Sequence, residues 1–199
     1  ADGHAETGVT ILYQTEELDA GDIILQEHVS IGAEETAGAL ERRLADLAAT
    51  LLQEAVRLIV EGRAPRRPQD PAGATYVGKL TKEDGRIDWT RSAQELANLV
   101  RAMEPWPSAF TYRGGRLLKI WRARVAKDPA GETPAAPPVS PAPEPGTVLA
   151  VTEEGILVAA GRGMLRVEEV QPEGGRRMNA EAYVRGHRVA AGERWGERT

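Results

Sequence analysis

Apolar residues recur at helical spacing along one long segment near the start of the chain, residues 35–61. They stand three or four positions apart, at Leu40, Leu44, Leu47, Leu51, Ala55, Leu58 and Ile59. This spacing predicts an amphipathic helix with one buried stripe, and Gly62 is a residue type that commonly follows a helix end. Before it, residues 9–14 and 23–28 have the β-branched, apolar character of neighbouring strands.

Two strands are too few to cover a helix of this length, because a two-stranded pair is only marginally stable in water. We therefore expect residues 1–62 to be the C-terminal part of a larger α/β domain, with both strands at the edge of its sheet. The chain opens at Ala1, just ahead of a strand and without a methionine. On this basis we expect further chain upstream of residue 1.

Residues 63–81 are expected to form a linker, because prolines between residues 64 and 73 prevent the helix from continuing and favour an extended path. Farther on, residues 92–95 have the form of a capping box and predict a short helix that ends before Pro105.

Five short segments in the rest of the chain read as strands, namely residues 110–113, 116–125, 147–152, 156–160 and 164–170. The first two are joined by Gly114 and Gly115, which suit a hairpin turn. Residues 128–146 contain seven prolines and no periodicity, which predicts a flexible loop, and a short helical segment is expected to start at Asn179. The predicted fold is therefore α/β followed by all-β, with an OB-like β-barrel over residues 82–199.

Charge is unevenly distributed along the chain. The formal net charge is −5, yet residues 1–61 carry −10 and the remainder carries +5. Residues 107–127 contain six bases and no acid, which predicts either a nucleic-acid-binding face or an ordinary solvated strand face. Strict strand alternation would set Lys119 on the opposite side from Arg116, Arg122 and Arg124.

Two tryptophans lie in or beside this basic stretch, Trp106 between two prolines and Trp121 in a predicted strand. Either indole could stack on a nucleic-acid base, but buried tryptophan is commoner. Core packing is therefore the preferred interpretation.

Composition excludes several classes of protein. There is no cysteine, so neither disulfides nor thiolate zinc sites can form. The sequence shows no apolar run of about 18 residues and no signal-peptide pattern, so we expect a soluble, cytoplasmic protein without a membrane span. We also find no metal-binding constellation.

The candidate for chemistry is Asp19, which lies in a turn between the two predicted strands at the edge of the sheet. Without further information a carboxylate in such a turn is more often a hydrogen-bond acceptor for the main chain. Asp22 is expected to be structural. His4, His28 and His187 are expected to be structural or surface residues.

Several segments together carry a family resemblance. They are Glu6 to Leu12 (ETGVTIL), Leu18 to Asp22 (LDAGD), Lys79 to Trp89 (KLTKEDGRIDW) and Arg101 to Pro107 (RAMEPWP). In this order they resemble the folate-dependent formyltransferases, and the segment Lys79 to Trp89 resembles the branch that formylates methionyl-tRNA.

The resemblance implies transfer of a formyl group from 10-formyltetrahydrofolate to methionyl-initiator-tRNA by a monomer that uses no metal. It assigns Asp19 a catalytic role beside an Asn and a His of the motif Asn-x-His-x-Ser-Leu-Leu-Pro. Because this motif is absent from the chain, the isolated chain is expected to be inactive. In the second domain the expected tRNA-binding residues are Lys79, Lys82, Arg113, Arg116, Lys119, Arg122 and Arg124.

Two alternatives remain open. One is a related formyltransferase that acts on an amino-sugar nucleotide, although such a substrate needs no extended positive surface. The other is a non-catalytic OB-type nucleic-acid-binding module.

Overall fold

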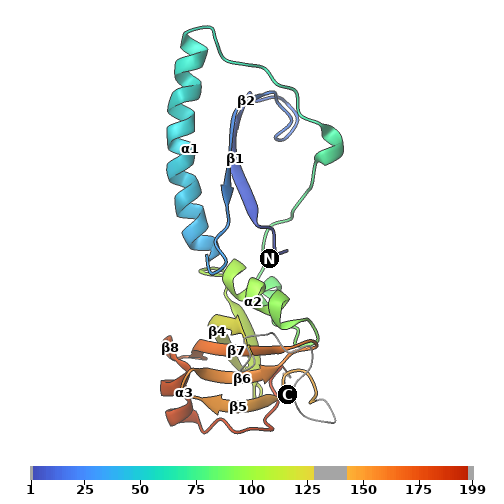
Figure 1. The fold of residues 1–199 in the computed structure, drawn as a ribbon, viewed down its shortest axis with the longest axis vertical. Coiled ribbons are helices and arrows are strands. Elements are labelled where there is room, and N and C mark those ends of the chain that lie inside the picture. The colour runs from blue at the N-terminus through green and yellow to red at the C-terminus, as the bar shows by residue number, and fades with distance from the viewer. Residues whose placement is uncertain (1, 128–142, 197–199) are drawn as a thin grey trace. The chain divides into compact units, whose positions relative to one another are not determined.

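The computed structural model describes residues 2–127 and 143–196 of the 199-residue chain (Figure 1). The predicted loop over residues 128–146 therefore lies mostly outside the described residues. The chain separates into two compact units, an N-terminal unit from His4 to Lys79 and a C-terminal unit that begins at Leu80.

The N-terminal unit is an antiparallel strand pair with one long helix. Strand β1 (Glu6–Leu12) pairs with β2 (Ile23–Ser30), and α1 (Ala37–Val60) follows. Helix α1 begins at the Thr36 side chain, which caps its first turn by accepting a hydrogen bond from the Ala39 N–H. The predicted strands and helix are confirmed, with ends shifted by a few residues.

Helix α1 buries its apolar stripe only in part. Ala55 is buried and Leu44, Leu47 and Leu51 are half-buried, but Ile59, which the spacing placed in the stripe, is 47% exposed. Two strands cover one side of a helix, and the positions beyond that side stay in solvent.

The segment after α1 runs back along β2. The Ile23 N–H donates to the Arg67 carbonyl (2.8 Å) and the Arg67 N–H to the Ile23 carbonyl (3.2 Å). A 3-10 turn follows over Pro71–Gly73, and residues 71–82 are exposed. The first part of the predicted linker is therefore bound to the strand pair.

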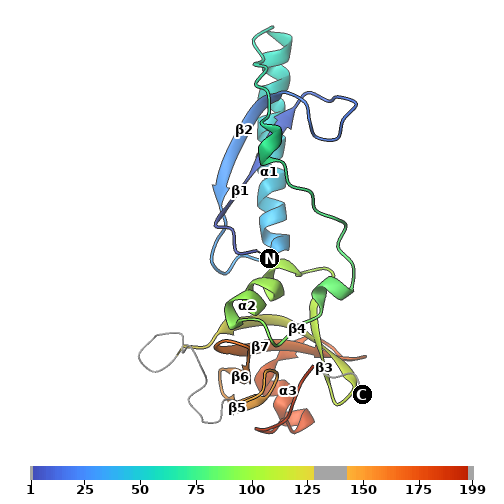
Figure 2. The same ribbon diagram turned by 90° about the vertical axis from the view of Figure 1, so that its right-hand side faces the viewer.

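The C-terminal unit is a six-stranded antiparallel sheet with two helices (Figure 2). Its elements are a 3-10 turn at Glu83–Gly85, α2 (Ala93–Ala102), β3 (Ala109–Arg113), β4 (Arg116–Val125), β5 (Val148–Thr152), β6 (Gly155–Ala159), β7 (Met164–Pro172), β8 (Met178–Asn179) and α3 (Ala180–His187). The strand order is β3-β4-β7-β6-β5, with the short β8 paired to β7. All five predicted strands are present, whereas the two-residue β8 carries no signal in the sequence.

The start of α2 follows from its local sequence. The Ser92 hydroxyl accepts a hydrogen bond from the Glu95 N–H, and the Glu95 carboxylate accepts one from the Ser92 N–H at 3.0 Å. Hydrogen bonds from the Ser92 hydroxyl and N–H, with help from Arg91, lower the pKa of Glu95 to about 2. The predicted capping box is confirmed.

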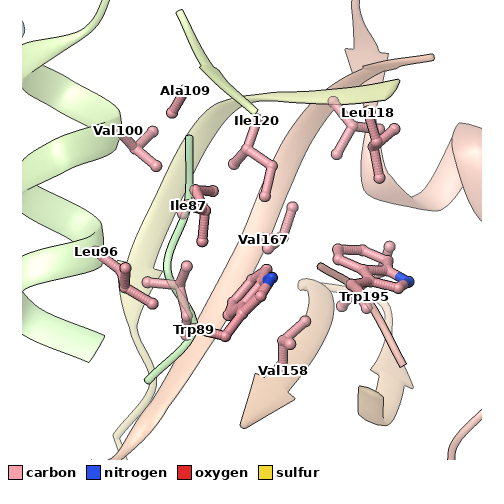
Figure 3. Close-up of a cluster of buried hydrophobic side chains, with 14 of the residues drawn as sticks. Ile87, Trp89, Leu96, Val100, Ala109, Leu118, Ile120, Val158, Val167 and Trp195 are labelled. Carbon is pink, nitrogen blue, oxygen red and sulfur yellow. The ribbon is translucent and has the colours of Figure 1, made fainter. Parts of the chain in front are cut away.

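The core of the C-terminal unit lies between α2 and the sheet (Figure 3). Trp89 and Trp195 meet edge to face with ring centroids 6.2 Å apart, and the Trp89 indole N–H donates to the Thr111 hydroxyl at 3.0 Å. Leu96 from α2 and Val158 and Val167 from the sheet are fully buried in the same cluster.

Residues 192–196 connect the two edge strands of this sheet. On the β5 side, the Val148 N–H donates to the Glu193 carbonyl and the Gly192 N–H donates to the Val148 carbonyl. On the β3 side, the Gly196 N–H donates to the Tyr112 carbonyl. Both edges are thereby partly paired, although β3 and β5 do not pair with each other.

Candidate functional site

Asp19 lies in the connection between β1 and β2 and is exposed, with a left-handed backbone (φ 54°). The Gln69 amide donates to the main-chain carbonyls of Asp19 and Gly21, at 2.7 Å each. These bonds hold the main chain of the turn. Within residues 2–127 and 143–196 the Asp19 carboxylate makes no hydrogen bond or ion pair, so it is available to a group from elsewhere.

The turn requires a glycine at position 21 for a steric reason. A Cβ atom at Gly21 would lie 1.6 Å from the Tyr13 carbonyl oxygen, so any side chain there would displace the turn. The neighbouring Asp22 pairs with Arg66 at 3.4 Å, and the Arg66 guanidinium lies 3.9 Å from the centre of the Tyr13 ring. Asp22 thus has a structural partner, as expected.

The histidines do not complete a proton-handling group with Asp19 in the described part of the chain. His4 and His28 are exposed in the N-terminal unit, and His187 belongs to α3 of the other unit. Asp19 shares no hydrogen bond with any of them.

The segment Lys79 to Trp89 buries Ile87 and Trp89 but exposes Leu80 and both lysines. Ile87 and Trp89 are buried, and the Ile87 N–H donates to the Phe110 carbonyl at 2.8 Å. Lys79 and Lys82 are exposed, and neither forms an ion pair with a described residue. Both ammonium groups are therefore available to an anion.

A β-bulge in β4 changes the direction of its basic side chains. The pairing with β7 shifts between Ile120 and Arg122 and again between Arg122 and Ala123. Ile120 and Ala123 both face the core, so Lys119, Arg122 and Arg124 all lie on the outer side. The separation of Lys119 from Arg122 and Arg124 that strict alternation predicted is therefore wrong.

The outer face of β4 carries less net charge than its arginines suggest. Glu168 on β7 pairs with both Arg122 (3.0 Å) and Arg124 (3.5 Å). The Lys119 ammonium lies 5.5 Å from the centre of the Trp121 ring. The Glu168 carboxylate therefore offsets part of the positive charge of Arg122 and Arg124.

Arg113 is engaged within the protein. Its guanidinium donates to both carboxylate oxygens of Glu193, to the Tyr183 hydroxyl at 3.2 Å and to the His187 carbonyl at 2.9 Å. Hydrogen bonding to Glu193 raises the pKa of Arg113. Burial by itself would raise the pKa of Glu193, but hydrogen bonds from Arg113 and Trp195 leave that pKa below its ordinary value.

The tryptophans differ in exposure. Trp106, expected in the core, is 57% exposed. Trp121 is half-buried, donates its indole N–H to Gln171 at 3.0 Å and lies beneath Arg177, 5.0 Å from the ring centre. Core packing is therefore wrong for Trp106 and only partly right for Trp121.

A hollow of about 410 Å³ lies in the C-terminal unit. Its walls come from the β3–β4 hairpin, the turn between β7 and β8, and helix α3. The lining brings Arg176 and His187 together with Arg116, which lies about 60 residues or more earlier in the chain, and this approach depends on the sheet.

Two family models of known proteins match this chain, one mainly in each unit. The family model "Formyl transferase" matches residues 1–56, and "Formyl transferase, C-terminal domain" matches residues 79–188. The chain belongs to the formyltransferase family.

Methionyl-tRNA formyltransferases are among the curated relatives of this formyltransferase chain. The enzyme of Symbiobacterium thermophilum is 46% identical over 194 residues, which cover 97% of this chain and 56% of the relative. That of Moorella thermoacetica is 44% identical over 191 residues, covering 96% and 58%. The chain thus spans a little over half the length of these relatives.

Solved structures show the same fold at low identity. HypX from Aquifex aeolicus in complex with tetrahydrofolic acid matches with a TM-score of 0.63 at 20% identity, covering 92% of this chain and 30% of that one. WlaRD, a sugar 3N-formyl transferase, matches with a TM-score of 0.63 at 16% identity, covering 83% and 56%.

The described residues contain neither of two other kinds of site. None of their helices has the length and apolar character needed to cross a bilayer. Nor do three or more of their His, Asp or Glu side chains gather as a metal ion would require.

Proposed function

We propose that the protein transfers a formyl group from 10-formyltetrahydrofolate to the amino group of methionyl-initiator-tRNA in translation initiation. One observation carries this proposal: identity to methionyl-tRNA formyltransferases of 38–46% extends through both units of the chain. Because the chain spans 56–61% of the first relatives' lengths, the proposal concerns the whole protein.

The division of labour that we propose assigns residues 1–62 to the C-terminal part of the catalytic domain, 63–81 to a linker and 82–199 to tRNA binding. Support comes from the division between Lys79 and Leu80, near the end of the proposed linker, and from the two family models, which match residues 1–56 and 79–188. We further propose that the C-terminal unit is an OB-like barrel. The pairing of residues 192–196 with both β3 and β5 supports this, because barrels use such pairing to protect open edges.

Asp19 is the catalytic residue we propose. In formyl transfer the acceptor nitrogen forms a bond to the formyl carbon, the bond from that carbon to the folate nitrogen breaks, and one proton passes from the acceptor amine to the folate nitrogen. A carboxylate assists this step by holding or orienting a proton. The exposed, unpartnered Asp19 carboxylate on a sterically restricted turn is suited to that task.

Two hollows, of about 410 and 370 Å³, are lined by residues of the C-terminal unit. Neither of these two hollows includes Asp19, which contributes a proton-handling group.

For tRNA binding we propose that exposed cations contact phosphates. Lys79, Lys82 and Arg116 are the strongest candidates, because none forms an ion pair with a described residue. Lys119, Arg122 and Arg124, on the outer face of β4, are further candidates. Arg113 we assign to holding α3 in place, because its guanidinium is occupied by Glu193, Tyr183 and the His187 carbonyl.

The partners we propose are initiator methionyl-tRNA and the folate donor, acting with a monomer that needs neither metal nor membrane. Because translation initiation takes place in the cytoplasm, we place the protein there.

The test is a formylation assay of the protein expressed from its complete reading frame. Methionyl-initiator-tRNA and a dTDP-amino sugar are offered separately as acceptors. Formation of formyl-methionyl-tRNA supports the proposal. Formylation of a dTDP-amino sugar alone identifies an amino-sugar enzyme instead, and tRNA binding without formylation of either acceptor identifies a non-catalytic binding module. Either of these last results overturns the proposal.

A further inference from the structure

The hollow beside α3 holds more positive than negative side chains. Its charged and titratable lining consists of Arg113, Arg116, Arg176, Tyr183 and His187, with Glu173 as the one carboxylate. The adjoining lining is apolar and includes Leu117, Leu118 and Met178. Such a combination of convergent polar groups with an apolar wall is typical of small-molecule sites.

Arg113 supports this hollow from behind. Its guanidinium joins β3 to Glu193, to the Tyr183 hydroxyl and to the His187 main chain, so its positive charge is already matched by a carboxylate. Arg113 therefore fixes the wall formed by α3 and leaves ligand contact to the other cations.

Arg116 and Arg176 are the cations without a partner. Both are exposed, both line the hollow, and neither makes a hydrogen bond or ion pair within the described ranges. Arg176 follows Gly175, where a Cβ would lie 2.7 Å from the Pro172 ring, so the turn that carries it has little steric freedom. Two guanidinium groups, one at the start of β4 and one in the turn between β7 and β8, thus line one hollow.

His187 contributes an oriented imidazole. Its ring stacks on Tyr183 with centroids 4.3 Å apart and an interplanar angle of 20°, and its Nδ1 lies 3.0 Å from the Tyr183 carbonyl. Because Nδ1 is engaged, Nε2 is the ring nitrogen that remains for a ligand.

We propose that this hollow is a phosphate-binding pocket in which the Arg116 and Arg176 side chains hold the phosphate oxygens and the His187 imidazolium, with Nδ1–H on the Tyr183 carbonyl, donates its Nε2–H as a third contact. Guanidinium groups bind phosphate through paired, charge-assisted hydrogen bonds. A volume of about 410 Å³ leaves room for a nucleoside beside the phosphate. The source of the phosphate rests on the proposed function: a backbone phosphate of the tRNA is the natural ligand, and a free nucleotide has the same chemistry.

The experiment uses the chain with 15N labelling and three probes, namely inorganic phosphate, adenosine monophosphate and methionyl-initiator-tRNA. The small probes are titrated while the amide signals of Gly174, Gly175 and Arg176 are followed. Binding of tRNA is measured from low to moderate salt to obtain the slope of log K against log salt.

Three variants give opposed expectations. The double variant Arg116→Gln/Arg176→Gln is expected to weaken phosphate binding by about 10-fold and to reduce the tRNA salt slope by about 1.5–2, because two phosphate contacts are lost. Glu173→Gln is expected to strengthen binding by about 2- to 3-fold, because the one repelling charge is removed. Arg185→Gln is the matched control: Arg185 is exposed on α3, pairs with Glu181 and does not line the hollow.

The outcomes separate this pocket from the proposed function. If the salt slope falls in the double variant but not in Arg185→Gln, the tRNA backbone is the source of the phosphate. If adenosine monophosphate shifts the amide signals but tRNA does not bind, the pocket is supported and the proposed function is refuted. If the double variant matches Arg185→Gln with every probe, the pocket is refuted, even where the wild-type chain binds tRNA with a steep salt slope.

Discussion

Replacement of Trp195 tests whether residues 192–196 are an integral part of the C-terminal unit. Trp195 is 1% exposed, packs edge to face on Trp89 and donates its indole N–H to Glu193 at 3.0 Å. Trp195→Ala removes a buried indole and leaves a cavity, which costs about 3–5 kcal/mol in the free energy of unfolding. Trp195→Phe keeps most of the buried area and loses the hydrogen bond, so we expect a cost of about 1–2 kcal/mol.

Urea denaturation followed by tryptophan fluorescence is the appropriate assay. All four tryptophans of the chain, Trp89, Trp106, Trp121 and Trp195, belong to the C-terminal unit, so their emission reports the unfolding of that unit alone. The matched control is Trp106→Ala, which removes the same side chain from a site that is 57% exposed. The control is expected to change the free energy of unfolding by less than about 0.5 kcal/mol.

Equal costs for Trp195→Ala and Trp106→Ala would refute the reasoning, because they would show that residues 192–196 do not stabilise the sheet. If Trp195→Ala is unfolded before urea is added, the smaller loss of unfolding free energy in Trp195→Phe still measures what Trp195 contributes to stability. A Trp195→Phe variant with wild-type stability would likewise contradict a stabilising role for the Trp195 indole and its hydrogen bond to Glu193.

Three further predictions concern the proposed chemistry and the local electrostatics. Asp19→Asn in the complete protein is expected to lower the formylation rate by roughly 100-fold or more with an unchanged unfolding midpoint, and normal turnover would remove Asp19 from the mechanism. Charge reversal at Lys79 and Lys82 is expected to raise KM for tRNA but not for the folate, whereas an unchanged tRNA KM would argue against docking by these lysines. The pKa of Glu95 is lowered to about 2 in the folded chain, so its stabilising effect is full above its ordinary value of 4.5 and is lost as pH falls from there toward about 2. The difference in urea midpoint between wild type and Glu95→Gln should therefore shrink over that pH range, and a constant difference would contradict it.

Local signals in the sequence predicted much of the secondary structure. The Ser92 and Glu95 side chains cap α2 as their spacing indicates, and Gly114 and Gly115 form the turn between β3 and β4. The 3.6-residue periodicity placed α1 within two residues of its observed ends. These features depend on groups a few residues apart, so the chain specifies them without reference to the rest of the molecule.

The candidate site was only partly visible in the sequence. Asp19 and its turn were identified by resemblance, and the exposed lysines Lys79 and Lys82 by their place in a matching segment. The bulge in β4 was not visible, because the extra residue follows from the pairing of β4 with β7 rather than from its own composition.

By itself, then, the sequence determined the helices, most strands, the division of charge between the two halves and the family. Tertiary structure alone decided that Arg113 is held by Glu193, 80 residues away, and that Arg116, Arg176 and His187 line one hollow. The physical reason is range: capping, turns and periodicity are set by neighbours along the chain. Ion pairs and pockets depend on which distant segments the sheet brings together, and many strand orders are compatible with the same local pattern.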